Sequence, residues 1–250
     1  MDIGEKLLVK NDICLVMLHG NSLDPTIFNP IIKEIVEKVK VATFCLPGHG
    51  NTPKLENYKF DELGCSVIER INKIAGKKIV FAHSLGGHLI LQNLEKLSGI
   101  KHVICVGTPP LRSIKDMSTA FTQIGALMYK EKWEDSELDE IISSLTQNNQ
   151  QLIREVLIKS DPGFRKALND ASNFENFKNE IENLQKTKFK VSLVFSNDDK
   201  YIDIEYCQNM ETLIENENVE CVFLPHGGHL PFFNYPVDFF RLMNELLTSA

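Results

Sequence analysis

Long apolar runs are missing from this 250-residue chain. No uninterrupted apolar stretch approaches the ~18 residues that a membrane-spanning helix needs, and the first dozen residues, MDIGEKLLVKND, lack the apolar core of a secretory signal peptide. Blocks of lysine and arginine are missing as well, and the net charge is −7, which argues against a phosphate-binding surface for nucleic acid. We therefore expect a protein without a membrane span that does not bind nucleic acid.

Closely paired cysteines are also missing. None of the six cysteines forms a CxxC pair, and four of them lie inside apolar runs, which is typical of free buried thiols and not of a disulfide framework. Free thiols fit a reducing compartment, so we expect a cytoplasmic location. The six are Cys14, Cys45, Cys65, Cys105, Cys207 and Cys221.

Six short apolar runs do occur, and they alternate with segments of helical periodicity. The runs are continuous, as in strands buried on both faces of a parallel sheet. This order predicts an α/β protein, a three-layer α/β/α sandwich with a mostly parallel sheet. The expected strands are residues 13–20, 40–50, 77–84, 101–110, 190–199 and 219–229, with a small leading strand near residues 5–9. The expected crossover helices are residues 30–39, 60–76, 88–99, 206–218 and 236–250.

One long segment, residues 111–187, interrupts this alternation. It has no strong strand pattern and predicts helices over residues 118–129, 136–145, 148–160 and 161–174. In the last of these, Asp161 suits the N-cap position and Pro162 suits the first turn. An insertion of this length within an α/β sheet is typical of a cap or lid. We expect a core formed by residues 1–110 and 188–250 and a helical cap formed by residues 111–187.

The heptapeptide FAHSLGG, residues 81–87, lies where an expected strand meets a helix. A nucleophilic serine on a tight strand-to-helix turn needs small residues two positions before and two positions after it. Ala82 and Gly86 meet this need, although the first position is usually glycine. The alternative is that Ser84 caps the following helix through its hydroxyl. The heptapeptide alone leaves both interpretations open.

A nucleophilic serine requires a general base and an acid that orients the base. Asp199 and His229 follow the ends of two later strands, at the carboxyl edge of the sheet where Ser84 is also expected. Asp198 and Asp203 compete for the role of the acid, and His226 competes for that of the base. We favour Asp199 and His229, because the glycine pair before His229 lets the chain turn sharply into the site.

The same chemistry requires two hydrogen-bond donors for a developing oxyanion. One expected donor is the backbone N–H of Leu85, directly after the nucleophile. The loop HGNSLD after the first strand is expected to supply the other, with Asn21 as the candidate.

Five segments together resemble the α/β-hydrolase superfamily: LHGNSLD, LPGHGNT, AHSLGG, SNDDKYID and GGHLPFF. The resemblance covers nearly the whole chain except the helical insert, which lies where the family carries its variable cap. Before the PGHG turn, many relatives have an acidic residue where this chain has Leu46. The resemblance implies that epoxide hydrolases and haloalkane dehalogenases carry aspartate at the elbow, so Ser84 disfavours both.

Acyl chemistry remains. We expect a serine hydrolase that cleaves a small or medium carboxylic ester or thioester through a Ser84–His229–Asp199 triad and an acyl-enzyme. The substrate is a small molecule, and the reaction needs no metal or cofactor. A metal site at His226 and His229 is disfavoured, because the intervening Gly-Gly indicates a loop and not a helix.

Two other functions stay open at this stage, because a fold does not fix a function. One is a C–C bond hydrolase or lyase acting on a carboxylated metabolite, for which Arg112 is the candidate basic group. The other is a ligand-binding receptor with slow turnover. For the substrate pocket we expect His83, Arg112, Phe121, Met128 and Trp133, although the last three also suit packing between cap helices.

Overall fold

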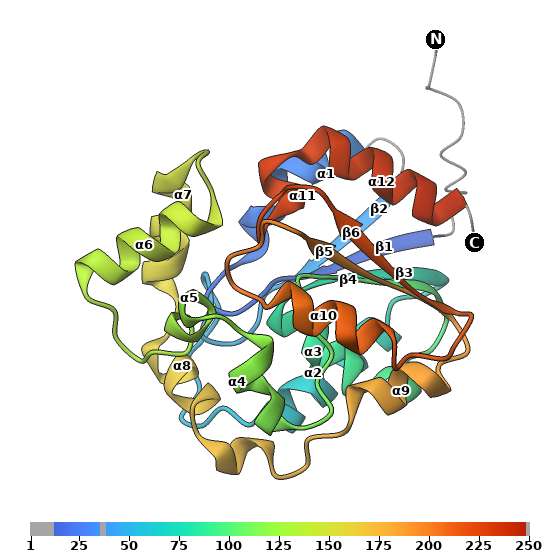
Figure 1. Ribbon diagram of the computed structural model, residues 1–250, viewed down its shortest axis with the longest axis horizontal. Helices are drawn as coiled ribbons and strands as arrows, with labels where there is room; N and C mark the ends of the chain where they lie inside the picture. Colours follow the sequence, from blue (N-terminus) through green and yellow to red (C-terminus); the bar gives the residue numbers. More distant parts are fainter. Residues whose placement is uncertain (1–12, 36–38, 249–250) are drawn as a thin grey trace.

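The computed structural model describes residues 13–35 and 39–248. At its centre lies a parallel six-stranded sheet in the order β2-β1-β3-β4-β5-β6, with helices on both faces (Figure 1). The predicted three-layer α/β/α fold is confirmed, while the small strand expected near residues 5–9 lies outside the described residues. The strands are β1 (Ile13–Leu18), β2 (Lys40–Phe44), β3 (Lys77–His83), β4 (Ile100–Val106), β5 (Lys190–Ser196) and β6 (Val219–Leu224).

The two helical layers come from different parts of the chain. On one face, α1 (Asn29–Ile35), α11 (Pro231–Asn234) and α12 (Pro236–Thr248) pack together, preceded by the short 3-10 helix η1 (Pro25–Phe28). The other face carries helices that connect the strands, together with the last helix of residues 111–187 (Figure 1). They are α2 (Phe60–Asn72), α3 (Leu85–Leu91), η2 (Leu94–Lys96), α9 (Glu180–Lys186) and α10 (Ile204–Glu211).

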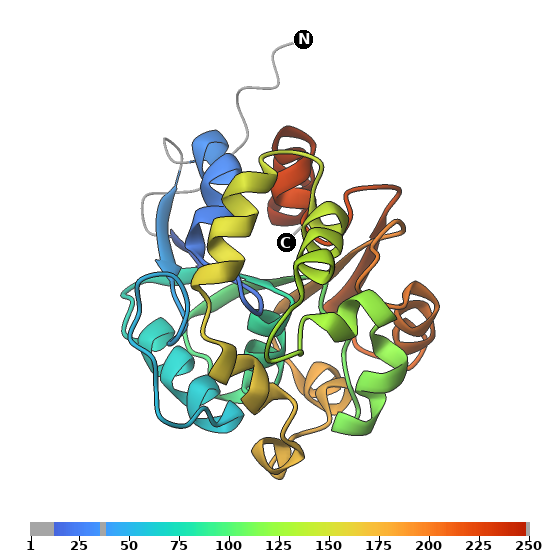
Figure 2. The same ribbon diagram turned by 90° about the vertical axis from the view of Figure 1, so that its left-hand side faces the viewer.

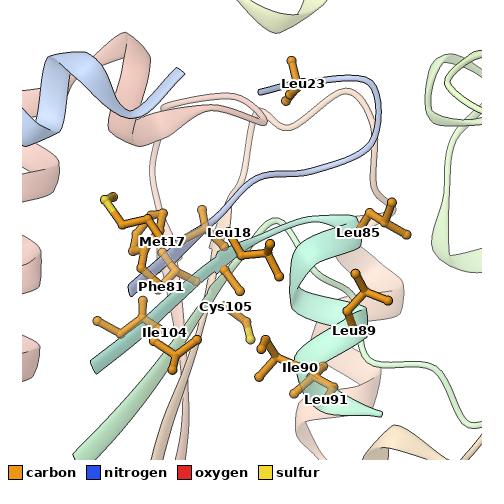
Figure 3. Close-up of a cluster of buried hydrophobic side chains, with 14 of the residues drawn as sticks. Met17, Leu18, Leu23, Phe81, Leu85, Leu89, Ile90, Leu91, Ile104 and Cys105 are labelled. Atoms are coloured by element: carbon orange, nitrogen blue, oxygen red, sulfur yellow. The ribbon is translucent and has the colours of Figure 1, made fainter. Parts of the chain in front are cut away.

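Alternate residues of the central strands fill the two interfaces between sheet and helices. The parallel register aligns Met17 of β1 with Phe81 of β3, and Phe81 with Ile104 of β4. The next row, which includes Leu18 and Cys105, points to the opposite face, because successive side chains of a strand alternate. Figure 3 shows this second row on the side of α3. All five side chains are almost completely buried, so the end of β3 and the start of α3 are held by dense packing on both sides.

The insert after β4 lies over the carboxyl ends of the strands (Figure 2). Its two ends meet, because Leu111 N–H donates to the Glu180 carboxylate at 2.8 Å and Glu180 N–H donates to Leu111 O at 2.8 Å. Asp161 caps its helix as predicted, accepting Gly163 N–H at 3.1 Å. The division into core and cap at residues 111–187 stays a prediction. The elements are η3 (Ile114–Asp116), α4 (Met117–Ala120), α5 (Gln123–Leu127), α6 (Asp135–Leu145), α7 (Gln150–Lys159), α8 (Pro162–Leu168) and η4 (Ala171–Phe174).

Several helices differ from the sequence prediction: the one expected over residues 161–174 is divided into α8 and η4, and the one expected over residues 206–218 ends at Glu211. The helix expected over residues 88–99 begins earlier, at Leu85, and ends at Leu91. It begins there because the carbonyl of Ser84 already accepts the N–H groups of Gly87 and His88. The helix expected over residues 118–129 is divided into α4 and α5, since Phe121 forms an antiparallel bridge with Ile202. Within the ranges 13–35 and 39–248, no helix combines the length and apolar character that crossing a membrane requires.

Candidate active site

Ser84 lies at the turn between β3 and α3. Its backbone has φ 50° and ψ −118°, a region that residues with side chains rarely occupy. The hydroxyl makes no capping hydrogen bond to α3, so the helix-cap alternative does not describe this residue. The turn is also crowded: a Cβ on Gly86 would lie 2.6 Å from His19 O, and Ala82 is fully buried. This is the strained, close-packed geometry of a nucleophile elbow.

His229 and Asp199 lie in the loops that follow β6 and β5. His229 Nδ1–H donates to one Asp199 oxygen at 2.8 Å, and Tyr201 N–H donates to the other at 2.8 Å. A carboxylate only accepts, so Nδ1 carries a proton, and in the neutral form of the ring Nε2 has the lone pair. His229 and Ser84 line the same cavity. Within the described residues no hydrogen bond joins Nε2 to the Ser84 hydroxyl, and such contacts often form only when substrate is bound.

The competing acidic residues and histidine have other positions. Asp198 accepts the backbone N–H that precedes His229 at 2.8 Å. Asp203 is the N-cap of α10 and accepts a backbone N–H of its first turn at 2.7 Å. His226 is exposed and does not line the cavity. Of the candidates, the structure brings together only Asp199 and His229.

The two predicted oxyanion donors are the backbone amide of Leu85, directly after Ser84, and that of Asn21, on the wall of the same cavity. Leu85 N–H opens α3, while Asn21 lies in the loop after β1 and lines the cavity with Ser84. Within the described ranges, neither of these N–H groups has a hydrogen-bond partner. The Asn21 side chain is fixed, because its Nδ2–H donates to Met128 O at 2.6 Å. Two amides with free N–H groups near a serine can receive a developing oxyanion.

Two neutral histidines hold the Asn21 loop in place. His19 Nε2 accepts Leu46 N–H at 3.0 Å, and His49 Nε2 accepts Ser22 N–H at 3.1 Å. Each histidine therefore fastens its own loop to the loop that carries the other. Burial lowers the pKa of His19 to about 4 and that of His49 to about 3, which keeps both rings neutral acceptors at pH 7. The loop needs this support, since Ser22 has a positive φ of 58°.

His83 supports His229 from the end of β3. Its Nε2–H donates to His229 O at 2.9 Å, and the two ring centroids lie 4.7 Å apart. Complete burial, with His229 nearby, holds the pKa of His83 well below its ordinary value. His83 therefore acts on the site as a neutral brace for the backbone of His229.

A small cavity connects these groups with the insert. Its volume of about 20 Å³ is enough for roughly one water molecule, so a substrate can enter only when side chains of the insert move. The predicted pocket residues His83, Phe121 and Met128 do line it. The complete lining is Asn21, Leu23, His83, Ser84, Phe121, Gly125, Met128, Tyr129, Leu145, Tyr201 and His229.

Arg112 and Trp133 lie elsewhere, which corrects their assignment to this pocket. Arg112 is exposed and pairs with Asp116 at 3.0 Å, four residues along the chain, so its charge is compensated outside the cavity. Trp133 packs under the guanidinium of Arg165 at 3.8 Å and donates its indole N–H to Leu127 O at 2.7 Å. Trp133 thus holds the insert together, which is the alternative that its sequence left open.

Sequence reasoning missed several residues that shape the site. The ring of Tyr201 stacks on His229 with centroids 4.8 Å apart, and its hydroxyl donates to Ile141 O in the insert at 2.6 Å. Gly107, at the end of β4 with φ 60°, lies under His229, because a Cβ there would be 3.0 Å from Nδ1. A tyrosine two residues after the acid and a glycine at a strand end were the available signals. Neither becomes informative until the strands are placed side by side.

A second buried histidine–carboxylate pair was also missed. His88, one helical turn after Ser84, donates Nδ1–H to Glu180 at 3.1 Å. Glu180 further accepts Gln92 Nε2–H at 3.0 Å and Leu111 N–H at 2.8 Å. Histidine and glutamate are 92 positions apart in the chain, so no local sequence signal pointed to this pair.

No metal site is evident in the part of the chain that the structure describes. No group of three or more histidine, cysteine, aspartate or glutamate side chains there is arranged to hold an ion. His229 uses Nδ1 for Asp199, and His226 is exposed and packs against Tyr235 with ring centroids 4.9 Å apart.

Comparison with known proteins agrees with this geometry. A family model described as "Alpha/beta hydrolase family" matches residues 15–242, while a search of curated protein sequences gives no match. Among solved structures, the N-acyl homoserine lactonase AidH superposes with a TM-score of 0.83 at 20% identity, covering 95% of this chain and 89% of that one.

Two further solved structures share the fold. An esterase from Thermogutta terrifontis has a TM-score of 0.75 at 16% identity, with 96% of this chain and 90% of that one covered. MenH from S. aureus has a TM-score of 0.73 at 21% identity, with 97% and 96% covered. At these identities the likeness shows the fold and leaves the substrate open.

Proposed function

The chain belongs to the alpha/beta hydrolase family, and we propose that it is a serine hydrolase that cleaves a small or medium carboxylic ester or thioester. One observation carries the proposal. Ser84 occupies a strained strand-to-helix turn, does not cap the helix, and shares a cavity with His229, whose Nδ1 is bonded to Asp199. A helix cap alone would need none of this arrangement.

In the proposed mechanism, Ser84 Oγ attacks the carbonyl carbon while His229 Nε2 accepts the hydroxyl proton. Asp199 keeps the ring in the required tautomer and stabilises the imidazolium. The N–H groups of Leu85 and Asn21 bind the oxyanion of the tetrahedral intermediate. His229 then gives its proton to the departing alcohol or thiol, leaving an acyl group on Ser84. Water attacks the acyl-enzyme with the same base and releases the acid.

The size and polarity of the cavity favour a small, uncharged substrate. Its lining includes no lysine or arginine among the described residues, and Arg112 lies outside it. A carboxylated metabolite would need such a partner inside a pocket, so the C–C hydrolase alternative has little support. Esterases and a lactonase share the fold, and a lactone is a cyclic ester within the proposed class.

The test is turnover of p-nitrophenyl acetate and butyrate by the wild type and by Ser84→Ala. We expect the wild type to release nitrophenol and the variant to lose at least about 10³-fold in kcat, since its hydroxyl is the nucleophile. Ser118→Ala, an exposed serine of α4, is the matched control and should behave as the wild type. Equal rates in wild type and Ser84→Ala would refute the proposal. Absence of turnover together with a ligand-dependent rise in melting temperature would favour the receptor alternative.

A further inference from the structure

A second chamber lies behind the wall of the cavity at Ser84. Phe121 and Tyr129 line both spaces and separate them. The second chamber has a volume of about 20 Å³, which suits a group the size of one water molecule or one hydroxyl. Its other walls are mainly apolar. They include Phe60, Leu111, Met117, Leu168, Phe174 and Phe177.

One of the polar side chains that line this chamber is His88. It is 95% buried, with 5% of its surface exposed, and it lines the chamber from the first turns of α3. Its Nδ1–H is committed to Glu180, so Nε2 lies on the opposite edge of the ring. Within the described residues Nε2 has no hydrogen-bond partner. A buried acceptor without a partner costs stability unless something binds to it.

A network of hydrogen bonds fixes the orientation of the His88 ring. Glu180 is completely buried and accepts hydrogen bonds from His88, from Gln92 and from the backbone of Leu111. Gln92 lies one turn after His88 on α3 and also exchanges hydrogen bonds with the backbone of Lys178, at 2.8 and 2.7 Å. The ring therefore cannot turn to satisfy Nε2 without breaking the bond to Glu180.

Tyr129 supplies a second polar group. Burial, together with the charge of Glu180, raises the pKa of its hydroxyl far above the ordinary value, so the hydroxyl stays protonated and can donate. In the described part of the chain that hydroxyl makes no hydrogen bond. An acceptor on His88 and a donor on Tyr129 form a complementary pair for a group that both donates and accepts.

We propose that His88 Nε2 and the Tyr129 hydroxyl bind a hydroxyl group on the acyl part of the substrate, and so make the protein selective for hydroxyacyl esters or thioesters. The ligand hydroxyl occupies the chamber, donates to His88 and accepts from Tyr129, while the carbon chain that carries it reaches the chamber past Phe121, whose side chain must move to admit it. His88 lies four residues after Ser84, roughly 6 Å along the helix, so the hydroxyl is a few bonds from the carbonyl that Ser84 attacks. The inference rests on the proposed function, because it assumes that an acyl group is held at Ser84.

The experiment compares thioesters that differ only in the hydroxyl. The substrates are the N-acetylcysteamine thioesters of hexanoate, 3-hydroxyhexanoate and 6-hydroxyhexanoate, with thiol release as the readout. We expect kcat/KM for one of the hydroxylated substrates to exceed that for hexanoyl by about tenfold or more, because a site built around a hydroxyl discriminates strongly against its absence.

Two substitutions assign the selectivity to the proposed groups. His88→Asn keeps a side-chain N–H that can donate to Glu180 but removes Nε2, and Tyr129→Phe removes only a hydroxyl. Each should bring the hydroxyacyl-to-hexanoyl ratio close to one. Tyr235→Phe, an exposed tyrosine distant from both cavities, should keep the wild-type ratio. A ratio that stays at the wild-type value in both test variants would overturn the assignment, and Tyr129→Phe decides the matter if His88→Asn does not fold.

Binding separates this inference from the proposed function. Dissociation constants of the uncharged amides 3-hydroxyhexanamide, 6-hydroxyhexanamide and hexanamide are measured by calorimetry on Ser84→Ala, which needs no turnover. Tighter binding of a hydroxylated amide supports the site even if no ester is cleaved. Equal affinities, with p-nitrophenyl acetate still cleaved in a Ser84-dependent manner, would leave the hydrolase intact and reduce the second chamber to a water site.

Discussion

In the described structure, two buried histidine–carboxylate pairs have the same hydrogen-bond pattern but lie in different surroundings. In His229–Asp199 and in His88–Glu180, Nδ1–H donates to the carboxylate and Nε2 is left free. His229 Nε2 belongs to a cavity with a serine on a strained turn, whereas His88 lines a chamber of apolar walls with a tyrosine hydroxyl. The pair itself fixes only a tautomer and an orientation. What the free nitrogen faces decides whether such a pair suits proton transfer or binding.

The largest difference between the two pairs should appear when each carboxylate is converted to its amide. Asp199→Asn should lower kcat for p-nitrophenyl acetate by about 10³–10⁴-fold, because the amide stabilises the wrong tautomer of His229. Glu180→Gln should lower kcat for the same ester by less than about tenfold, since His88 transfers no proton in the proposed mechanism. Steady-state kinetics of both variants provide the measurement. Losses of similar size would show that His88 takes part in the chemistry.

The two pairs also differ in the segments that they connect, and the free energy of unfolding should reflect this difference. Glu180 joins α3 to both ends of the insert, so Glu180→Ala leaves buried donors of His88, Gln92 and Leu111 unsatisfied. We expect a loss of about 3–5 kcal/mol in the free energy of unfolding, measured by urea denaturation. Glu182→Ala, an exposed glutamate two residues later, is the control and should change it by less than about 0.5 kcal/mol. A small loss for Glu180→Ala would mean that the insert is anchored elsewhere.

The substitution Gly107→Ala should displace His229 and leave His88 in place. In Gly107→Ala the new Cβ would lie 3.0 Å from His229 Nδ1, at a backbone φ of 60° that disfavours side chains. We expect kcat to fall about 10- to 100-fold through displacement of His229, with the ratio between hydroxyacyl and hexanoyl substrates unchanged. Gly163→Ala, where the nearest atom would be 3.4 Å away, should keep wild-type kcat. A changed ratio in Gly107→Ala would indicate that the two sites are coupled.

The sequence was informative where one segment determines its own environment. Continuous apolar runs predicted the strands, and small residues around Ser84 predicted a tight strand-to-helix turn there, because both signals are local. His88–Glu180, Tyr201 over His229 and the reciprocal bonds of His19 and His49 depend on segments far apart in the chain. Their positions follow from the strand order, which periodicity does not specify. Arg112 was misplaced for a different reason, because its partner Asp116 lies only four residues along the chain and keeps it at the surface.

The smallest expected effect is the pH dependence of the free energy of unfolding that two other buried histidines contribute. Within residues 13–35 and 39–248, neither His19 nor His49 is hydrogen-bonded to a carboxylate, and burial lowers their pKa values from 6.5 to about 4 and about 3. The unfolded chain binds a proton at each near pH 6.5 and the folded protein does not. Their contribution is therefore complete above pH 6.5, and the free energy of unfolding declines as the pH falls from 6.5 toward 4.

His49→Gln tests this with little change in hydrogen bonding, because the amide oxygen of glutamine can accept Ser22 N–H in place of Nε2. The variant should lose one titrating group, so its unfolding free energy should fall less steeply with acid, by about 1.4 kcal/mol per pH unit between pH 6 and 5. Urea denaturation at pH 7.5, 6.0 and 5.0 measures the slope. His226→Gln, at an exposed histidine, should keep the wild-type slope. Parallel slopes for wild type and His49→Gln would mean that His49 is already protonated in the folded protein, and then its ring could not serve as the acceptor that holds the Asn21 loop.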